Sequence, residues 1–180
     1  MGWSPANAVK AFLDTVNLCK LEQDRNQAEP ESTEFMSALA AGMNAQLIVE
    51  ASSSAAPTCT IGLAAAARQT GGRLVCILPE KARDETVAET IKALGLEDAT
   101  KFVIGDAMEL LPKYKNVDFA VIDSRLTEDY QGLFTLLNLN PSRAMVVANN
   151  LFDKKPTNAN ARTFKRKPGA KTVTLPIGKG

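Results

Sequence analysis

The sequence predicts an α/β fold in which helices cover both faces of a doubly wound, mostly parallel sheet. From residue 46 onward, short β-branched runs alternate with segments rich in Ala, Leu, Glu and Lys. This alternation is typical of parallel strands joined by right-handed crossovers. The strand runs are apolar almost throughout, as expected where helices cover both faces. The 180 residues are expected to form a single domain, with N-terminal helices over 1–45 and the sheet over 46–180.

Two helices are expected before the first strand. The first has Ser4 as its N-cap and Pro5 at its first helical position. The apolar residues at helical spacing in this segment are Val9, Phe12, Leu13 and Val16. A polar connection over residues 22–32 follows, and a second helix is expected from about Thr33.

Six strands are expected in the remainder, and they lie at 47–50, 73–78, 101–105, 117–123, 144–149 and 171–177. The helices expected between them lie at 58–69, 83–94, 107–112, 127–138 and 157–165. The helix at 83–94 has the clearest pattern, because Val87 and Ile91 mark one face and Gly95 supplies a stop.

Histidine is absent from the sequence, which excludes several kinds of site. Ser-His-Asp and Cys-His catalysis, His-ligated zinc and a histidine general base all need this residue. The three cysteines, Cys19, Cys59 and Cys76, are widely spaced, which favours reduced thiols over a disulfide framework or zinc site. No apolar run approaches the roughly 20 residues that span a bilayer, and the N-terminus lacks a signal-peptide layout. A cytosolic protein is therefore expected.

The basic residues are concentrated near the end of the chain. Residues 1–152 hold 13 Lys and Arg against 19 Asp and Glu, whereas residues 153–180 hold 8 against 1. The segment 154–171 is therefore either a solvated surface loop or a contact for an acidic or phosphate-bearing partner. No aromatic residues interleave these charges as they do in single-strand binders, so nucleic acid is not the expected partner.

The candidate site residues follow the strands, because ligands of open α/β sheets bind beyond the carboxyl ends of the strands. Glu50 closes the first strand, and a loop of small residues with Ser52 leads to a helix that opens near Thr58. Such a loop either lets backbone N–H groups approach a ligand or merely caps the helix. No glycine lies between Gly42 and Gly62, so the dinucleotide fingerprint is missing, and no phosphate P-loop occurs.

Later strand ends supply further candidates. Glu80, just past the second strand, is either a ribose contact or an ordinary exposed residue. Asp106 and Ala107 follow the third strand, where Asp106 is placed to cap a short helix. Asp123 ends the fourth strand and is the strongest candidate, including for a catalytic role. Asp118 lies at the opposite edge and is interpreted as structural, while Asn149 and Asn150 end the fifth strand beside Asp123 if these strands are neighbours.

These segments resemble the class I S-adenosylmethionine-dependent methyltransferases, particularly the metal-dependent caffeoyl-coenzyme A and catechol type O-methyltransferases. The similarity covers about residues 40–180 and is carried by IVEASSSAAPTCTIGLA, GDAMELLP, VDFAVIDSR, ANNLF and VTLPIGKG. The chain is more similar still, over its whole length, to an uncharacterised plant family of methyltransferase-like proteins. That similarity includes the WSP of residues 3–5 and AAGMNAQLIVE of residues 40–50.

The resemblance implies a Rossmann-like class I methyltransferase fold, S-adenosylmethionine as cofactor and a small-molecule acceptor. The cofactor-binding positions that it implies, together with the strand-end argument, are Glu50, Ser52, Thr58, Glu80, Asp106, Ala107 and Asp123. It also implies a final hairpin, of which only the strand at 171–177 and its turn glycines are present, so the last strand is expected to be truncated.

The chain departs from that family at positions that matter for cofactor and metal. In the first motif, E-x-G-x-x-x-G-x-S, Ser52 and Ala56 replace both glycines, and the ribose-binding acid falls at Leu78. The metal-binding DADK is Asp123-Ser124-Arg125-Leu126 here, and the Asp-Asn pair is Ala148-Asn149. Divalent hard cations need several oxygen ligands, so no metal site is expected.

Three functions follow as alternatives. The first is an S-adenosylmethionine-dependent methyltransferase that acts on a small molecule without a metal, by proximity and orientation. The second is a catalytically inactive protein of the same fold that binds a ligand or partner, with a homodimer as one assembly. The third is a nicotinamide-dependent reductase, against which the missing glycine fingerprint weighs.

Overall fold

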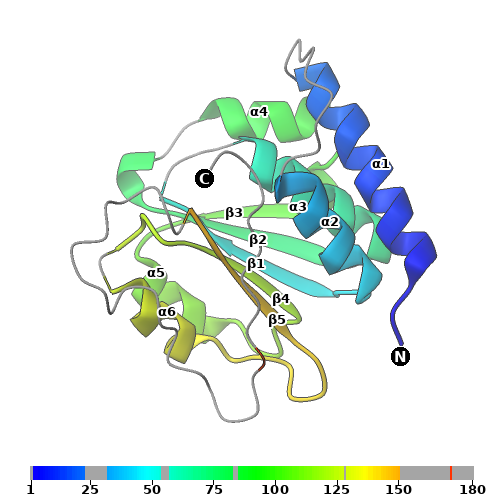
Figure 1. Ribbon diagram of the computed structural model, residues 1–180. Helices are drawn as coiled ribbons and strands as arrows, with labels where there is room; N and C mark the ends of the chain where they lie inside the picture. The colour runs from blue at the N-terminus through cyan, green and yellow to red at the C-terminus, as the bar shows by residue number, and fades with distance from the viewer. Residues whose placement is uncertain are drawn as a thin grey trace.

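A computed structural model of the protein describes residues 2–22, 32–53, 57–82, 85–127, 129–150 and 171. Its centre is a parallel five-stranded sheet in the order β3-β2-β1-β4-β5 (Figure 1). The strands are β1 (Leu47–Ala51), β2 (Arg73–Leu78), β3 (Thr100–Ile104), β4 (Phe119–Asp123) and β5 (Met145–Asn149). The strand order reverses between β1 and β4, which makes this a doubly wound sheet. The α/β, Rossmann-like fold class predicted from the sequence is confirmed.

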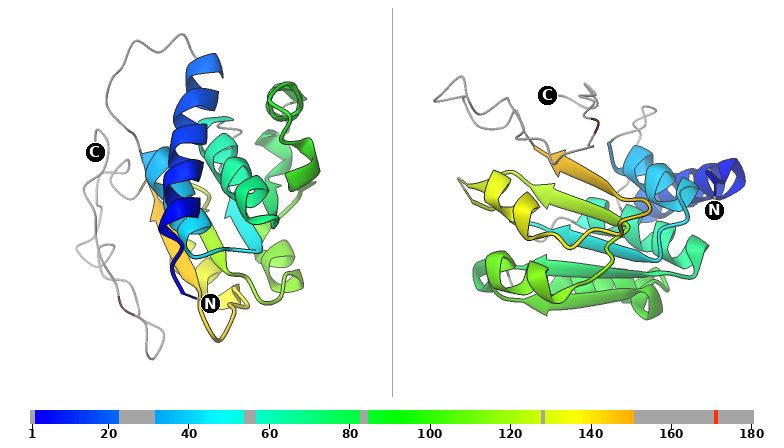
Figure 2. Two further views of the ribbon diagram at one scale, coloured as in Figure 1. Left: turned by 90° about the vertical axis from the view of Figure 1, so that its right-hand side faces the viewer. Right: turned by 90° about the horizontal axis from the view of Figure 1, so that it is seen from below.

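Helices lie on both faces of the sheet (Figures 1 and 2). One face carries α1 (Pro5–Glu22), α2 (Ser32–Gly42), α3 (Pro57–Thr70) and α4 (Glu85–Ala93), and the other carries α5 (Ala107–Leu110) and α6 (Tyr130–Leu136). Among the described residues, the connections also hold three short 3-10 helices, η1 (Glu80–Ala82), η2 (Glu97–Ala99) and η3 (Leu111–Lys113). Adjacent strand residues point to opposite cores: Ile48 packs with α1–α4, whereas Val49 packs with α5 and α6.

Local signals in the sequence account for several helix boundaries. Ser4 caps α1, because its Oγ accepts a hydrogen bond from the backbone N of Asn7 at 3.3 Å. On α4, Val87 and Ile91 are buried as predicted, and Gly95 follows with a φ of +64°, the left-handed conformation that ends helices. The predicted helix at 157–165 and strand at 171–177 lie outside the described residues, except for the exposed Lys171.

The buried face of α1 differs from the apolar residues that the sequence emphasised. Val9 and Leu13 are 59% and 54% exposed. The buried positions are instead small or short side chains, namely Ala8, Ala11, Thr15 and Cys19. The reason is the close approach of α1 to α2, where Thr15 Oγ1 donates a hydrogen bond of 2.8 Å to Ser37 Oγ. Small side chains permit this approach, whereas Val9 and Leu13 would hold the two helices apart.

No helix among the described residues is long and apolar enough to cross a membrane.

Asp118 joins β1 to β4 at the amino ends of these strands. The side chain is buried, and its Oδ2 accepts hydrogen bonds from the backbone N of Gln46 at 2.8 Å and of Leu47 at 3.1 Å. Its Oδ1 accepts from Asn140 Nδ2 at 2.7 Å and lies 3.9 Å from Arg143 Nε. One carboxylate thus joins the start of β1 to the segment that holds Asn140 and Arg143, which supports the structural interpretation of Asp118.

We expect the Asp118→Ala variant to lose about 3 kcal/mol of unfolding free energy, because it leaves several buried donors without an acceptor. Urea denaturation of the variant and the wild type measures this loss. Asp98→Ala, at an exposed position in η2, is the matched control and should change stability by less than about 0.5 kcal/mol. Equal losses in the two variants would contradict the anchoring role of Asp118.

Candidate functional site

The candidate site lies at the carboxyl ends of β1 and β4, where the strand order reverses. Ligands of doubly wound sheets bind at this kind of switch point. A small cavity of about 30 Å³ opens here. Its lining residues come from the ends of β1, β4 and β5 and from the start of α3, and they are Glu50, Ala51, Ser52, Cys59, Val121, Asp123, Arg125, Asn149 and Asn150.

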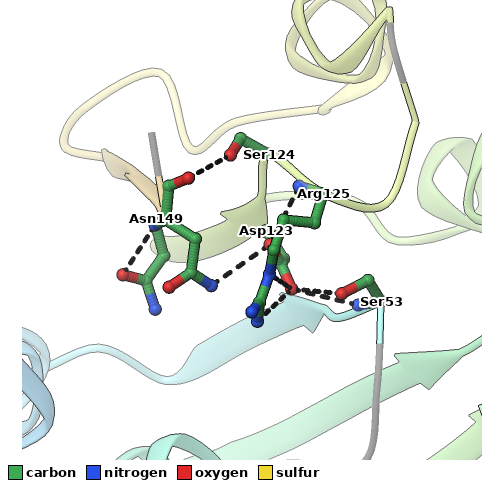
Figure 3. A network of polar contacts seen from close by, with 6 residues as sticks. Ser53, Asp123, Ser124, Arg125 and Asn149 are labelled. Carbon is green, nitrogen blue, oxygen red and sulfur yellow. Dashed lines mark hydrogen bonds and ion pairs between the residues drawn. The ribbon is translucent and has the colours of Figure 1, made fainter. Parts of the chain in front are cut away.

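Asp123 is the centre of a network of hydrogen bonds at this edge (Figure 3). Its Oδ2 accepts from Ser53 Oγ at 2.5 Å and from Ser53 N at 3.3 Å, which ties β4 to the loop after β1. Its Oδ1 accepts from Asn150 Nδ2 at 3.2 Å and from the backbone N of Arg125 at 2.9 Å. The Arg125 guanidinium lies across the carboxylate, with Nε 3.1 Å from Oδ1 and Nη2 3.1 Å from Oδ2.

These donors hold Asp123 in its charged form. Burial by itself raises the pKa of this carboxyl, but hydrogen bonds from Arg125, Ser53 and Asn150 outweigh it and lower the pKa to about 2. Asp123 is therefore an anion throughout the physiological pH range, and Arg125 is its counter-ion.

Glu50 is the last residue but one of β1, and its electrostatic environment is the opposite of that of Asp123. The side chain is 2% exposed, faces α3 and accepts a hydrogen bond from Thr60 Oγ1 at 2.9 Å. Burial raises the pKa of Glu50, the nearby charge of Asp123 adds to this rise, and hydrogen bonds from Thr60, Cys59 and Cys76 oppose it. Two neighbouring carboxyls are thus driven toward different protonation states, an arrangement that recurs at functional sites.

The two thiols beside Glu50 stay protonated. Burial, followed by the charge of Glu50, raises the pKa of both Cys59 and Cys76 well above that of an ordinary cysteine. All three cysteines are free, which agrees with the reduced state predicted from their spacing. Since the thiolate is the nucleophilic form, neither Cys59 nor Cys76 is suited to covalent catalysis here.

The structure places all of the predicted site residues at the carboxyl edge of the sheet but gathers only some of them in the cavity. Glu50, Ser52 and Asp123 line it, and Ser52 N also donates to Ile77 O of β2 at 3.1 Å. The other predicted residues lie outside this lining. Thr58 is in the first turn of α3 and Glu80 is exposed on η1. Asp106 caps α5 through a 2.8 Å bond from Met108 N, and Ala107 is the buried first residue of α5. The roles of all seven predicted residues in cofactor binding, inside and outside the cavity, stay predictions.

Sequence reasoning missed the contributions of Ser53, Cys59 and Thr60. Ser53 follows the predicted Ser52, and only the turn after β1 decides which of the two serines meets Asp123. Asn149 and Asn150 both lie at this edge as predicted, because β5 pairs with β4 and Asn149 stands opposite Asp123. Asn150 supplies the bond to Asp123, because a φ of +60° turns the chain just past the strand.

A larger depression of about 520 Å³ lies at the opposite edge of the sheet, with Asp118, Asn140 and Arg143 in its lining. The hydrogen bonds of Asp118 there hold the backbone N–H groups of Gln46 and Leu47 and the side chain of Asn140, which is a structural role. Across the described ranges, no three His, Cys, Asp or Glu side chains are grouped so that they could hold a metal ion.

The ionised Asp123 should make stability depend on pH at low pH. A lowered pKa in the folded state means stabilisation above the unfolded pKa, and a fall from 3.8 to about 2 corresponds to about 2 kcal/mol. We expect Asp123→Asn to be less stable than the wild type by about this amount at pH 7, with the difference shrinking from about pH 5 to pH 2. Urea unfolding at pH 7, 5 and 3 tests this, with Asp14→Asn on α1 as control. A difference that stays constant with pH would contradict the assignment.

Many solved structures share the fold, among them three methyltransferases. A methyltransferase from Geobacter sulfurreducens matches with a TM-score of 0.57 and 17% identity, over 78% of this chain and 70% of its own. The O-methyltransferase TomG from Streptomyces achromogenes, solved in complex with SAM, gives 0.53 and 19%, over 84% and 72%. An O-methyltransferase from Bacillus cereus, solved in complex with SAH, gives 0.54 and 16%, over 78% and 66%. At these identities the likeness establishes the fold.

Sequence comparison with curated proteins found no match. A family model described as "Protein of unknown function (DUF1442)" matches residues 1–180, and the chain therefore belongs to the DUF1442 family.

Proposed function

We propose that this protein binds S-adenosylmethionine and transfers its methyl group to a small-molecule acceptor without a metal ion. The observation that carries the proposal is the position of Asp123, an anionic carboxylate at the point where the strand order reverses. The fold that places it there is shared with methyltransferases. Two structural neighbours, TomG and the Bacillus cereus enzyme, were solved with SAM and SAH. A cationic sulfonium donor suits an anionic pocket.

The charged side chains at the site suit S-adenosylmethionine, whereas the cavity is small for a ligand of this size. Asp123 offers a carboxylate for the cationic part, and Glu80, exposed past the end of β2, is the candidate contact for the ribose hydroxyls. Small-molecule pockets hold roughly 300–1,000 Å³, whereas the cavity here is about 30 Å³. The Arg125 side chain forms part of its wall and is 38% exposed, so its movement toward solvent is the change that would enlarge it.

The protein's contribution to methyl transfer would be positioning. The bound donor supplies an activated methyl group, and holding two reactants in line can provide roughly 7–11 kcal/mol of barrier reduction. A general base works best with a pKa near the working pH, so a carboxyl of pKa about 2 is poorly suited to take the acceptor's proton. We therefore assign Asp123 to ligand binding and orientation.

A second candidate function is binding without catalysis, and the Asp123–Arg125 ion pair favours it. The pair satisfies the carboxylate internally and narrows the pocket that a donor would have to enter. This alternative predicts ligand binding with no methylated product, which separates it from the first.

Several features inferred from the sequence belong to the same proposal. We propose one methyltransferase-like domain over residues 1–180 in a cytosolic protein of plant origin, with a homodimer as its assembly. The basic segment 154–171, which lies outside the described residues except for Lys171, is proposed to contact an acidic or phosphate-bearing partner.

We expect calorimetry to detect binding of both S-adenosylmethionine and S-adenosylhomocysteine to the wild-type protein. Asp123→Asn should weaken S-adenosylmethionine binding by about tenfold or more, the loss typical of removing a charge-assisted hydrogen bond. The control Asp14→Asn alters a carboxylate on α1 that pairs loosely with Arg68 and should bind as the wild type does. Absence of binding to the wild type would refute the proposal.

Metal independence is the second test of the proposal. Arg125 is a cation where the resembled enzymes carry a carboxylate, and Ala148 removes a further oxygen ligand. We expect EDTA to leave donor binding and any methyl transfer unchanged, and calorimetry to detect no Mg²⁺ or Ca²⁺ binding at millimolar concentrations. Stimulation of either activity by Mg²⁺ would show that a metal site forms after all.

A further inference from the structure

Asp123 has more donors than a carboxylate can fully use. A carboxylate offers about four lone-pair positions on its two oxygens. Four donors that carry no charge already meet them, namely Ser53 N, Ser53 Oγ, Arg125 N and Asn150 Nδ2. The Arg125 guanidinium adds contacts from Nε and Nη2 to these four (Figure 3). The guanidinium therefore contributes mainly its positive charge.

Arg125 supplies the positive charge beside Asp123, and four neutral donors supply hydrogen bonds, so the charge can leave while these hydrogen bonds stay. If the Arg125 side chain turns toward solvent, the four neutral donors still hold Asp123 in place. The side chain of Asp123 is only 6% exposed, so the carboxylate would then need another cation nearby to offset its burial. The Arg125 side chain is 38% exposed, so water can solvate its guanidinium after it leaves.

We infer that the Asp123 pocket is a binding site for a positively charged organic group, and that Arg125 holds the place of this group until a ligand displaces it. The ligand class is an ammonium or sulfonium compound. A purely anionic ligand would face the Asp123 carboxylate, and a neutral one would leave that carboxylate without a counter-ion. A divalent metal is disfavoured, because among the described residues no three His, Cys, Asp or Glu side chains are grouped so that they could hold one.

Most substitutions in a binding site weaken binding, but removal of the Arg125 guanidinium should have the opposite effect. Because Arg125 competes with the ligand for Asp123, shortening this side chain should strengthen the binding of a cationic ligand. A residue that contacted the ligand directly would give the opposite result. Only the identity of the ligand, S-adenosylmethionine, rests on the function proposed above.

The first experiment measures S-adenosylmethionine binding to the wild type, Arg125→Ala and Arg125→Gln by calorimetry. Both variants should bind S-adenosylmethionine about tenfold more tightly. This factor corresponds to the loss of one charged hydrogen-bond donor that competes with the ligand for Asp123. Arg68→Ala is the matched control, because Arg68 pairs with Asp14 at 4.0 Å on the surface of α1 and α3. Unchanged or weaker binding to both Arg125 variants would overturn the inference.

The second experiment does not depend on the methyl donor. Arg125→Ala leaves space beside Asp123, and guanidinium ion added at millimolar concentration should bind there, shifting the NMR amide signals of Ser53 and Asn150. The wild type and Arg125→Ala/Asp123→Asn should show no such shifts. Failure of guanidinium to bind Arg125→Ala would refute the cation site. If guanidinium binds but no protein binds S-adenosylmethionine, the proposed function fails while the cation site stands.

Discussion

The rest of the structure depends on the pairing of β1 with β4. At each end of this strand pair, an aspartate accepts hydrogen bonds from residues in or next to β1. Asp118 precedes β4 and holds the first amides of β1. Asp123 ends β4 and holds Ser53, just past β1. The strand order reverses between these strands, so any ligand site at the carboxyl edge must form where they meet. The same pairing thus fixes the sheet and the position of the candidate site.

The pKa values of Glu50 and Asp123, which both lie at the carboxyl edge of the sheet, shift in opposite directions because their surroundings differ. Glu50 faces the helical core and meets Thr60 and two thiols, none of which carries a positive charge. Asp123 faces a turn that supplies backbone amides, a serine, an asparagine and a guanidinium. Burial acts on both groups, but only Asp123 has enough compensating donors to remain strongly acidic. This leaves one negative charge available for recognition.

Arg125 bears on both of the functions that we propose for this site. As part of the cavity wall it narrows the space available to a donor, and as a counter-ion it satisfies Asp123 without a ligand. An internal ion pair of this kind stabilises the empty protein and thereby lowers the affinity of any competing cation.

The sequence by itself determined the elements and the edge at which the chemistry lies. Apolar β-branched runs, the Ser4 and Asp106 caps and the Gly95 stop are local signals, because they act within a turn or two of the chain. Parallel strands place all of their carboxyl ends together, which made Asp123 a candidate and left Asp118 at the opposite edge.

Tertiary structure alone decided which faces are buried and which groups meet. The burial of Ala11 and Thr15 instead of Val9 and Leu13 depends on how closely α2 approaches α1. The bonds from Ser53 and Asn150 to Asp123 join residues 70 and 27 positions apart. Glu50 and Asp123 share strand-end positions in the sequence, yet their pKa values move in opposite directions. Burial and charge partners set these shifts, and both depend on contacts between distant segments that no local pattern encodes.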